Sequence, residues 1–131
     1  MRFIDPKGGT EPLGQRIIEL PQNEEQARAR NPHFGFVAYV PKGSIAKGEA
    51  LVANGGGKTL PCAICHGKTY QGLGDVPRIA GLHPNYIVRQ LWSIQNGERV
   101  GASAALMHQV VEKLDVGDML AIAAYLGSRA P

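Results

Sequence analysis

The two cysteines of this 131-residue chain lie three residues apart, and a histidine follows the second. The stretch is Cys62-Ala63-Ile64-Cys65-His66. On a short helical turn, two thiols with this spacing can each add to one vinyl group of a porphyrin, and an imidazole in the next position can ligate the iron. This spacing is the attachment motif of c-type haem. The sequence therefore predicts one covalent haem, attached through Cys62 and Cys65 and ligated by His66.

Two other uses of this motif need residues that the sequence does not supply nearby. Structural zinc takes four ligands, usually from a second Cys or His pair, and here it would have to recruit a distant histidine. A thioredoxin-like dithiol needs a strand–helix context, whereas a glycine-rich loop and Pro61 precede this motif. A disulfide across so small a loop would stabilise the fold little. A zinc-bound interaction module stays as the less favoured alternative.

The second axial position has five candidates, which are Met107, Met119, His33, His83 and His108. Met119 falls on the apolar stripe of a helix, which favours a packing role. Met107 follows a loop of small residues, 101–105, which can lie close to a flat ring. We predict that Met107 is the ligand and keep His108 as the alternative. A thioether ligand favours ferrous iron and raises the reduction potential.

Three main helices are expected to position these groups. The first runs from Ile45 to about Asn54 with Ser44 as its N-cap, and Gly48 inside it suits a close helix crossing. The second begins at Pro84, ends before Gly97 and carries an apolar stripe at 87, 91 and 94. The third follows Asp115 as N-cap and ends at Gly127, and a shorter helix is expected within 106–114.

Residues 1–42 differ from the rest because prolines and glycines break every long pattern. A short polar helix is expected at 24–30, and 36–40 has the local composition of a strand. We predict an extended arm laid on the domain rather than a sheet. Apolar residues such as Ile17 and Phe34 argue against a disordered linker. The predicted division is therefore an arm or linker over 1–42 and a haem domain over 43–131.

Composition and charge exclude some classes of protein. The net charge is +3, and lysines and arginines are scattered without a basic stripe, which argues against nucleic-acid binding. No apolar run is long enough to span a membrane. Residues 1–6 lack the apolar segment of a signal peptide. Since haem is attached to such motifs outside the cytoplasm, we expect a periplasmic protein whose export signal is not in this sequence.

From Gly43 to Arg129 the chain resembles the class I, mitochondrial-type cytochrome c domain. It is most similar to bacterial forms that occur as tandem haem domains or as single domains derived from them. The resemblance covers about two thirds of the chain. The residues that carry it are Gly48, Leu51 and Val52, Cys62 to Gly67, Val76 to Gly81, Tyr86, Gln90 and Leu91, Gly97 to Arg99, Met107, and Leu114, Asp118, Met119 and 124–126.

The resemblance implies an all-α fold, with three main helices and long loops wrapped around one haem. The first and last helices would cross at Gly48, with Tyr125 packed against it. Met107 would be the distal ligand, and the Pro77 carbonyl would accept a hydrogen bond from the second ring nitrogen of His66. The candidates for contacts in the haem pocket and to the propionates are Arg78, Gln90, Trp92 and Arg99.

The function implied is a one-electron carrier rather than an enzyme. No catalytic constellation such as paired carboxylates or a Ser-His-Asp pattern is apparent in the sequence. The expected partners are redox proteins that dock transiently near the exposed haem edge. Residues 11–18 and 36–44 are similar to stretches leading into haem domains of larger cytochromes, which suggests a second haem domain or subunit. The alternative function is a haem enzyme or gas sensor with an open sixth position.

Overall fold

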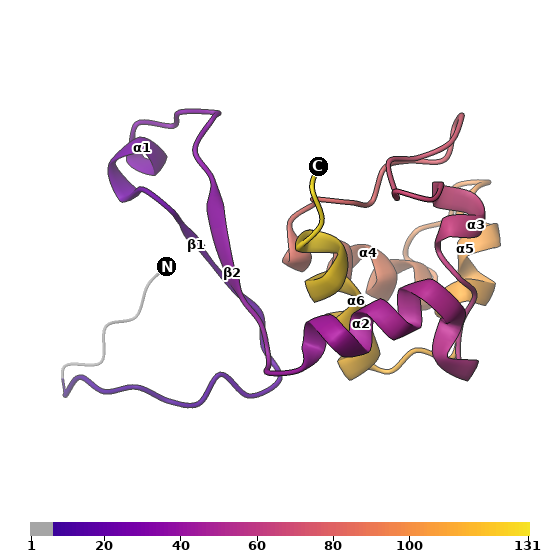
Figure 1. The fold of residues 1–131 in the computed structure, drawn as a ribbon, viewed down its shortest axis with the longest axis horizontal. Helices are drawn as coiled ribbons and strands as arrows, with labels where there is room; N and C mark the ends of the chain where they lie inside the picture. Colours follow the sequence, from indigo (N-terminus) through magenta and orange to yellow (C-terminus); the bar gives the residue numbers. More distant parts are fainter. Residues whose placement is uncertain (1–6) are drawn as a thin grey trace.

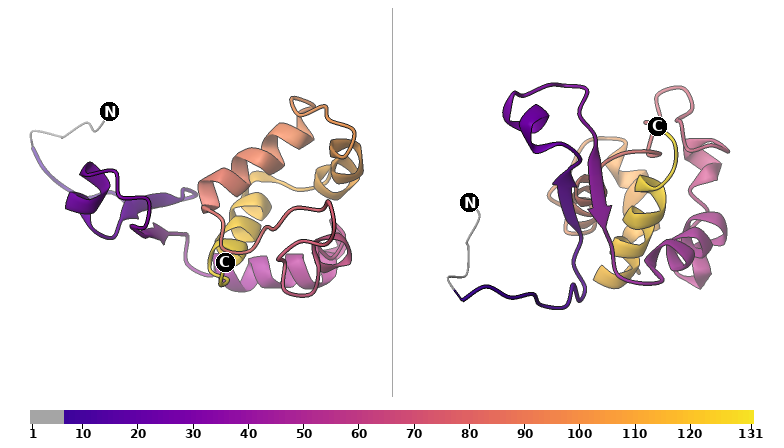
Figure 2. Two further views of the ribbon diagram at one scale, coloured as in Figure 1. Left: turned by 90° about the horizontal axis from the view of Figure 1, so that it is seen from above. Right: turned by 60° about the vertical axis from the view of Figure 1, so that its left-hand side comes forward.

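The computed structural model describes residues 7–131. The expectation about Met1–Pro6 and a signal peptide lies outside these residues. In chain order the elements are β1 (Ile18–Pro21), α1 (Glu24–Arg28), β2 (Phe36–Tyr39), α2 (Ser44–Asn54), the 3₁₀ turn η1 (Gly55–Gly57), α3 (Ala63–His66), α4 (Pro84–Gln95), α5 (Ala104–Val111) and α6 (Val116–Gly127). Helices α2 to α6 gather into one body, and β1, α1 and β2 extend from its side (Figures 1 and 2).

The crossing of α2 and α6 is the centre of the helical body (Figure 1). Gly48 is buried at the contact, and a Cβ there would overlap the Ala121 carbonyl and lie 2.8 Å from Cβ of Tyr125. Only glycine lets the two helices approach this closely. The predicted close crossing at Gly48 is therefore confirmed.

Helix α6 is buried along most of its length because its sequence is apolar on nearly every side. Nine consecutive residues, 118–126, are buried. A capping box opens the helix, in which the Asp115 carboxylate accepts from the Asp118 N–H and the Asp118 carboxylate accepts from the Asp115 N–H. The predicted N-cap at Asp115 and the end at Gly127 are both confirmed.

The second predicted helix matches α4, with Pro84 at its first turn and Gly97 in the left-handed region just beyond its end. The predicted start of the first helix needs one correction. The N-cap of α2 is Gly43, at φ 84°, and Ser44 is already helical and makes no capping hydrogen bond with its side chain. A left-handed turn is needed where the chain leaves the arm, and glycine adopts it without strain.

The prediction of an arm without a sheet was wrong in one respect. Strands β1 and β2 pair antiparallel, with Ile18 opposite Tyr39 and Leu20 opposite Val37. Helix α1 lies between the two strands in sequence and matches the predicted polar helix, with Asn23 as its N-cap. The hairpin contacts the helical body at the start of α4, where the Glu19 carboxylate accepts from the Asn85 side chain at 3.1 Å.

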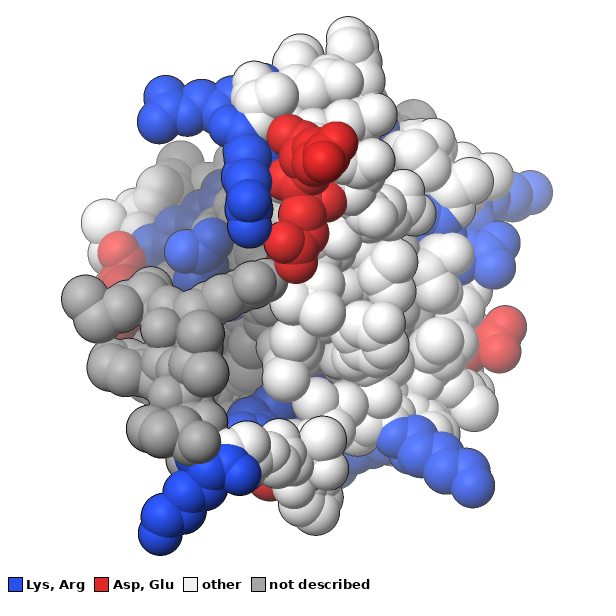
Figure 3. All heavy atoms as spheres, turned by 90° about the vertical axis from the view of Figure 1, so that its left-hand side faces the viewer, with Lys and Arg blue, Asp and Glu red and all other residues white. Residues whose placement is uncertain are grey.

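Charged side chains are spread over the molecule. On the face shown in Figure 3, lysines and arginines lie in small groups around the rim, acidic side chains lie beside one of these groups, and most of the centre is uncharged. This distribution agrees with the absence of a basic stripe in the sequence. In the described part of the chain, no helix combines the length and the apolar character that crossing a membrane requires.

Candidate haem-binding site

The one-turn helix α3 carries the Cys-x-x-Cys-His motif. Cys62 precedes its first residue, and the Cys62 N–H donates to the Val52 carbonyl at 3.0 Å, which ties the motif to the end of α2. The His66 N–H in turn donates to the Cys62 carbonyl at 2.9 Å. The motif is thus held as a helical turn, the local geometry that places both thiols and the imidazole on one side of a ring.

The His66 ring is oriented by a hydrogen bond to the opposite loop. His66 is 7% exposed, and its Nδ1 lies 2.7 Å from the carbonyl oxygen of Pro77. Because a carbonyl only accepts, Nδ1 carries the proton and Nε2 keeps its lone pair. An imidazole in this tautomer is prepared to bind a metal through Nε2.

The loop between His66 and Pro77 folds back tightly on the motif. The Gly72 N–H donates to the His66 carbonyl at 2.9 Å, and Leu73 and Val76 exchange a pair of backbone hydrogen bonds. Gly72 has φ 91°, and a Cβ there would lie 2.6 Å from the Val76 carbonyl oxygen. A side chain at position 72 would therefore push Pro77 away from His66.

The Cys62 thiol does not have the environment of a reactive dithiol. Burial raises the pKa of the Cys62 thiol to about 11, so it is protonated at neutral pH, whereas a redox-active Cys-x-x-Cys pair depends on a lowered pKa. Cys65 is exposed. No group of three or more His, Cys, Asp or Glu side chains that could hold a metal occurs within residues 7–131, so the zinc alternative lacks a ligand set there.

The five most exposed large apolar side chains of the described chain lie in α3, in α5 or in the loops next to these two helices. They are between 54% and 85% exposed, and they are Leu60, Ile64, Leu73, Val100 and Leu106. Two flank Cys62 in sequence, one lies in the loop after His66, and one precedes Met107 directly. Such apolar surface around a prepared imidazole fits a large apolar prosthetic group, which would remove it from water. Sequence reasoning did not name these residues, because they share no periodicity: three lie in loops, and Ile64 and Leu106 lie on two short helices.

The candidates for the second axial position occupy different environments. Met107 lies on α5, is half-buried and packs against the hydrophobic core. His108 is exposed, as are His33 in the arm and His83 at the start of α4. Met119 is 1% exposed within the core cluster, so its packing role is confirmed.

The structure brings together two of the four predicted pocket residues besides Pro77. Nη1 of Arg99 donates to Oε1 of Gln90 at 2.7 Å. Arg78 is exposed beside Pro77. Trp92 lies apart from the Gln90–Arg99 pair, in a surface hollow of about 320 Å³ that it shares with Val88 and Val116. Gln90 and Trp92 are two residues apart on α4, which places them on opposite flanks of the helix.

The chain is similar to several known proteins. No family model matches the chain. Cytochrome c-552 of Acidithiobacillus ferridurans is 43% identical over 67 residues, covering 51% of this chain and 28% of that protein. Cytochrome c-554(548) of Halomonas halodenitrificans is 35% identical over 78 residues, covering 59% of this chain and 94% of that protein.

A solved structure is similar over the same region. Cytochrome c4 of Acidithiobacillus ferrooxidans matches with a TM-score of 0.60 and 35% identity, covering 68% of this chain and 51% of that one. The chain thus spans about a quarter of the first relative, about half of this structure and nearly all of the Halomonas protein.

Proposed function

The chain belongs to the class I c-type cytochromes, and from this premise we propose that it is an electron carrier with one covalently attached haem c. When bound, the haem supplies a one-electron iron couple. The residues of this chain attach the haem, ligate its iron and keep water from the ring. No catalytic residue is needed for this function.

The observation that carries the proposal is the orientation of the His66 ring by its hydrogen bond to the Pro77 carbonyl. Its Nδ1–H is fixed on the Pro77 carbonyl, so Nε2 is free to bind iron, and the two thiols stand on the same helical turn. The exposed apolar residues around the motif give the ring its contacts. We therefore assign Cys62 and Cys65 to the thioethers, His66 to one axial position and Pro77 to the orientation of His66.

Met107 is proposed as the second axial ligand. It is the methionine on α5 that is half-buried at the edge of the core, whereas Met119 is enclosed within the core and His108 is exposed. With both axial positions filled, electron transfer requires little rearrangement of the protein. The remaining pocket proposals are Gln90 and Arg99, a hydrogen-bonded pair suited to a propionate, and Arg78 and Trp92.

The proposed partners are other redox proteins, met through small and transient contacts. The lysines and arginines are scattered along the sequence, and charges of this kind guide the encounter of redox partners. The relatives that extend well beyond the matched region support a second haem domain or subunit beside this one. We propose residues 43–131 as the haem domain, with 1–42 as its arm, and a periplasmic location, where haem c is attached.

An absorption spectrum of protein made with the haem-attachment machinery tests the function. We expect sharp low-spin bands of haem c in the reduced protein, and in the oxidised protein the weak near-infrared band of a methionine–ferric iron bond. Haem bands with rapid binding of carbon monoxide to the reduced protein would instead support an open site. Absence of haem would refute the proposal.

Met107→Ala tests the ligand, with His108→Ala as the matched control one residue away. We expect Met107→Ala to keep the haem, lose the near-infrared band and lower the reduction potential, because a thioether stabilises ferrous iron. His108→Ala should leave both properties as in the wild type. If His108 were the ligand, the wild-type protein would lack the near-infrared band, and His108→Ala rather than Met107→Ala would open the iron to carbon monoxide.

A further inference from the structure

The C-terminal end of α5 is held by side chains from two other segments. The last carbonyls of a helix have no partners within the helix, and buried carbonyls without partners are costly. Val111 and Leu114, at and just beyond this end, are both buried. The Leu114 N–H supplies one local donor, to the Val111 carbonyl at 3.1 Å, and further donors come from elsewhere in the fold.

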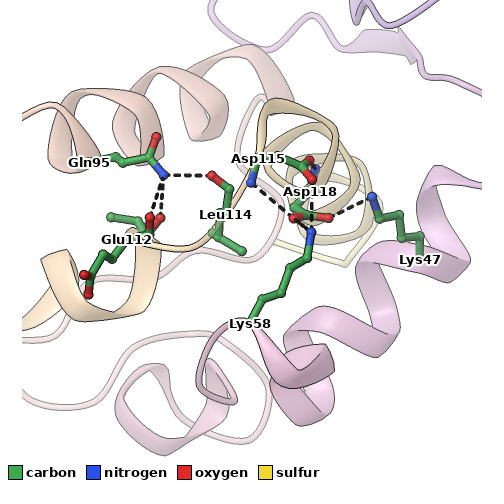
Figure 4. Close-up of polar contacts among 8 residues, drawn as sticks. Lys47, Lys58, Gln95, Glu112, Leu114, Asp115 and Asp118 are labelled. Atoms are coloured by element: carbon green, nitrogen blue, oxygen red, sulfur yellow. Dashed lines mark hydrogen bonds and ion pairs between the residues drawn. The ribbon is translucent and has the colours of Figure 1, made fainter.

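Gln95, at the end of α4, supplies one set of donors. Its Nε2 donates to the carbonyl of Val111 at 2.6 Å and to that of Leu114 at 2.8 Å, and the Glu112 carbonyl lies at 3.5 Å (Figure 4). All three neighbours are acceptors, so only the NH₂ group of the amide can face them. One side chain thus fixes both the last turn of α5 and the loop after it.

Thr59 supplies the other donor. Its hydroxyl donates to the Val110 carbonyl at 2.5 Å. Thr59 lies three residues before Cys62, and Val110 lies three residues after Met107, about one helical turn. This hydrogen bond connects the segment that enters the haem motif directly to the helix that carries Met107.

Among the described residues, no side-chain hydrogen bond of this kind holds the N-terminal end of α5. Ser103 precedes the helix and makes no capping hydrogen bond with its side chain. The loop before it is exposed, as are Leu106 and Ala105 in the first turn. The position of Met107 is therefore set by its packing against the core and by the C-terminal end of α5.

We propose that Gln95 and Thr59 are positioning residues for Met107, because they hold the carbonyl end of α5 and so keep the thioether at the iron. The inference rests on the proposed function, in which Met107 is the axial ligand. Neither side chain touches the iron in this proposal. Their effect is on how readily another ligand replaces Met107.

The test is competition by added imidazole for the ferric iron of the holoprotein. Gln95→Ala removes two short hydrogen bonds, and Thr59→Val removes one with little change of shape. Since a net hydrogen bond contributes about 1 kcal/mol, the two bonds lost in Gln95→Ala should lower the imidazole concentration at half-replacement roughly thirtyfold, and the one bond lost in Thr59→Val should lower it roughly fivefold. Amides of α5 should also exchange hydrogen faster in both variants.

Two comparisons separate positioning from a general loss of stability. Gln109→Ala removes a glutamine from α5 itself, where its side chain is exposed and makes no hydrogen bond to the described residues, and it should bind imidazole as the wild type does. Gln95→Lys keeps N–H donors and places a cation at a helix C-terminus, so it should restore much of the wild-type behaviour.

The outcomes distinguish this inference from the ligand assignment. If Met107→Ala leaves the near-infrared band intact, the assignment of Met107 fails and the inference falls with it. If Met107→Ala behaves as expected while Gln95→Ala and Thr59→Val bind imidazole as Gln109→Ala does, only the positioning role is overturned. If Gln95→Ala does not fold, Thr59→Val decides the question alone.

Discussion

Asp118 is an almost fully buried carboxylate, and two lysines from other segments neutralise it. Its oxygens lie 2.8 Å from Nζ of Lys47 on α2 and 2.6 Å from Nζ of Lys58 after η1 (Figure 4). Burial opposes its ionisation, but hydrogen bonds from both lysines outweigh burial and lower the pKa from 3.8 to about 2. The ionised carboxylate therefore ties α2, η1 and the start of α6 together.

This pKa sets the pH range over which Asp118 stabilises the fold. A carboxyl group with a lower pKa in the folded state stabilises above its unfolded pKa, and the stabilisation disappears as the pH falls through the folded value. We expect Asp118→Asn to lower the free energy of unfolding by about 2 kcal/mol at pH 7, and the difference from wild type to vanish between about pH 4 and pH 2. Denaturant unfolding of the wild-type and Asp118→Asn holoproteins at pH 7 and at pH 2 measures this difference in stability.

Asp75→Asn is the matched control for this prediction. Asp75 is exposed and makes no ion pair with the described residues, so its substitution should change stability little at either pH. A loss for Asp118→Asn that stayed constant from pH 7 to pH 2 would show that shape or capping, rather than charge, accounts for it.

At the scale of elements, the crossing of α2 and α6 depends on one missing side chain. Gly48→Ala would gain helix propensity of up to about 1 kcal/mol, but its Cβ would overlap the Ala121 carbonyl, which belongs to a helix backbone and cannot rotate away. We expect a net destabilisation of about 1–2 kcal/mol, since overpacking at a close contact costs more than propensity returns. Thermal unfolding followed by far-UV circular dichroism measures the change.

Glu49→Ala is the control for Gly48→Ala, because Glu49 is the next residue of α2 and is exposed. It should be neutral or slightly stabilising through helix propensity. If Gly48→Ala were as stable as the wild type, α2 and α6 could move apart at no cost in free energy. That result would contradict the tight packing expected at their crossing.

The elements that the sequence predicted well are those specified by local signals. Asp115 and Asp118 are three residues apart at the start of an apolar run, which is the spacing of a capping box, and Pro84 and Gly97 bracket α4. The haem motif is likewise local, since five consecutive residues define it. Each of these features is specified by residues that lie within one turn or one helix of each other in the sequence.

The features that the sequence did not predict depend on contacts between distant residues. Pairing of β1 with β2 joins residues about 20 apart across a helix and loops, and nothing near Ile18 identifies it as a strand. In the sequence, Gln95 looks like an ordinary polar residue of a helix. Its hydrogen bond to the end of α5 becomes visible only in the folded structure. The exposed apolar residues of α3, α5 and their adjoining loops follow no helical or strand periodicity. Their proposed partner is the haem, which is not a helix or strand of this chain.

At the scale of the whole molecule, the arm has two different faces. Opposite residues of an antiparallel pair share a face. Ile18 with Tyr39 and Leu20 with Val37 make one apolar and exposed face, whereas Glu19 and Phe36 belong to the other, which meets the helical body. There the Phe36 ring stands edge-on to His83 at 4.7 Å between centroids.

A two-stranded hairpin is at best marginally stable alone, so these contacts decide whether the arm keeps its place. His83, the N-cap residue of α4, makes no capping hydrogen bond with its side chain. The Glu19 carboxylate of the arm caps the helix instead. It accepts from Nδ2 of Asn85 at 3.1 Å and from the Asn85 backbone N–H at 3.5 Å. His83, 3.7 Å from the same carboxylate, adds an ion pair when it is protonated. Glu19 thus joins the arm to the haem domain.

Glu19→Ala should release the arm while leaving the haem site intact. Loss of a charged cap costs about 1 kcal/mol, so we expect trypsin to cut after Arg28 and Arg30 roughly fivefold faster, with an unchanged absorption spectrum. Glu49→Ala, which removes an exposed carboxylate from α2, should leave the cleavage rate at the wild-type value.

If Glu19→Ala is cut no faster than Glu49→Ala, then Phe36 and the strand pairing hold the arm without the carboxylate. If instead the haem spectrum changes with the cleavage rate, the arm supports the haem domain itself, and residues 43–131 are not an independent unit.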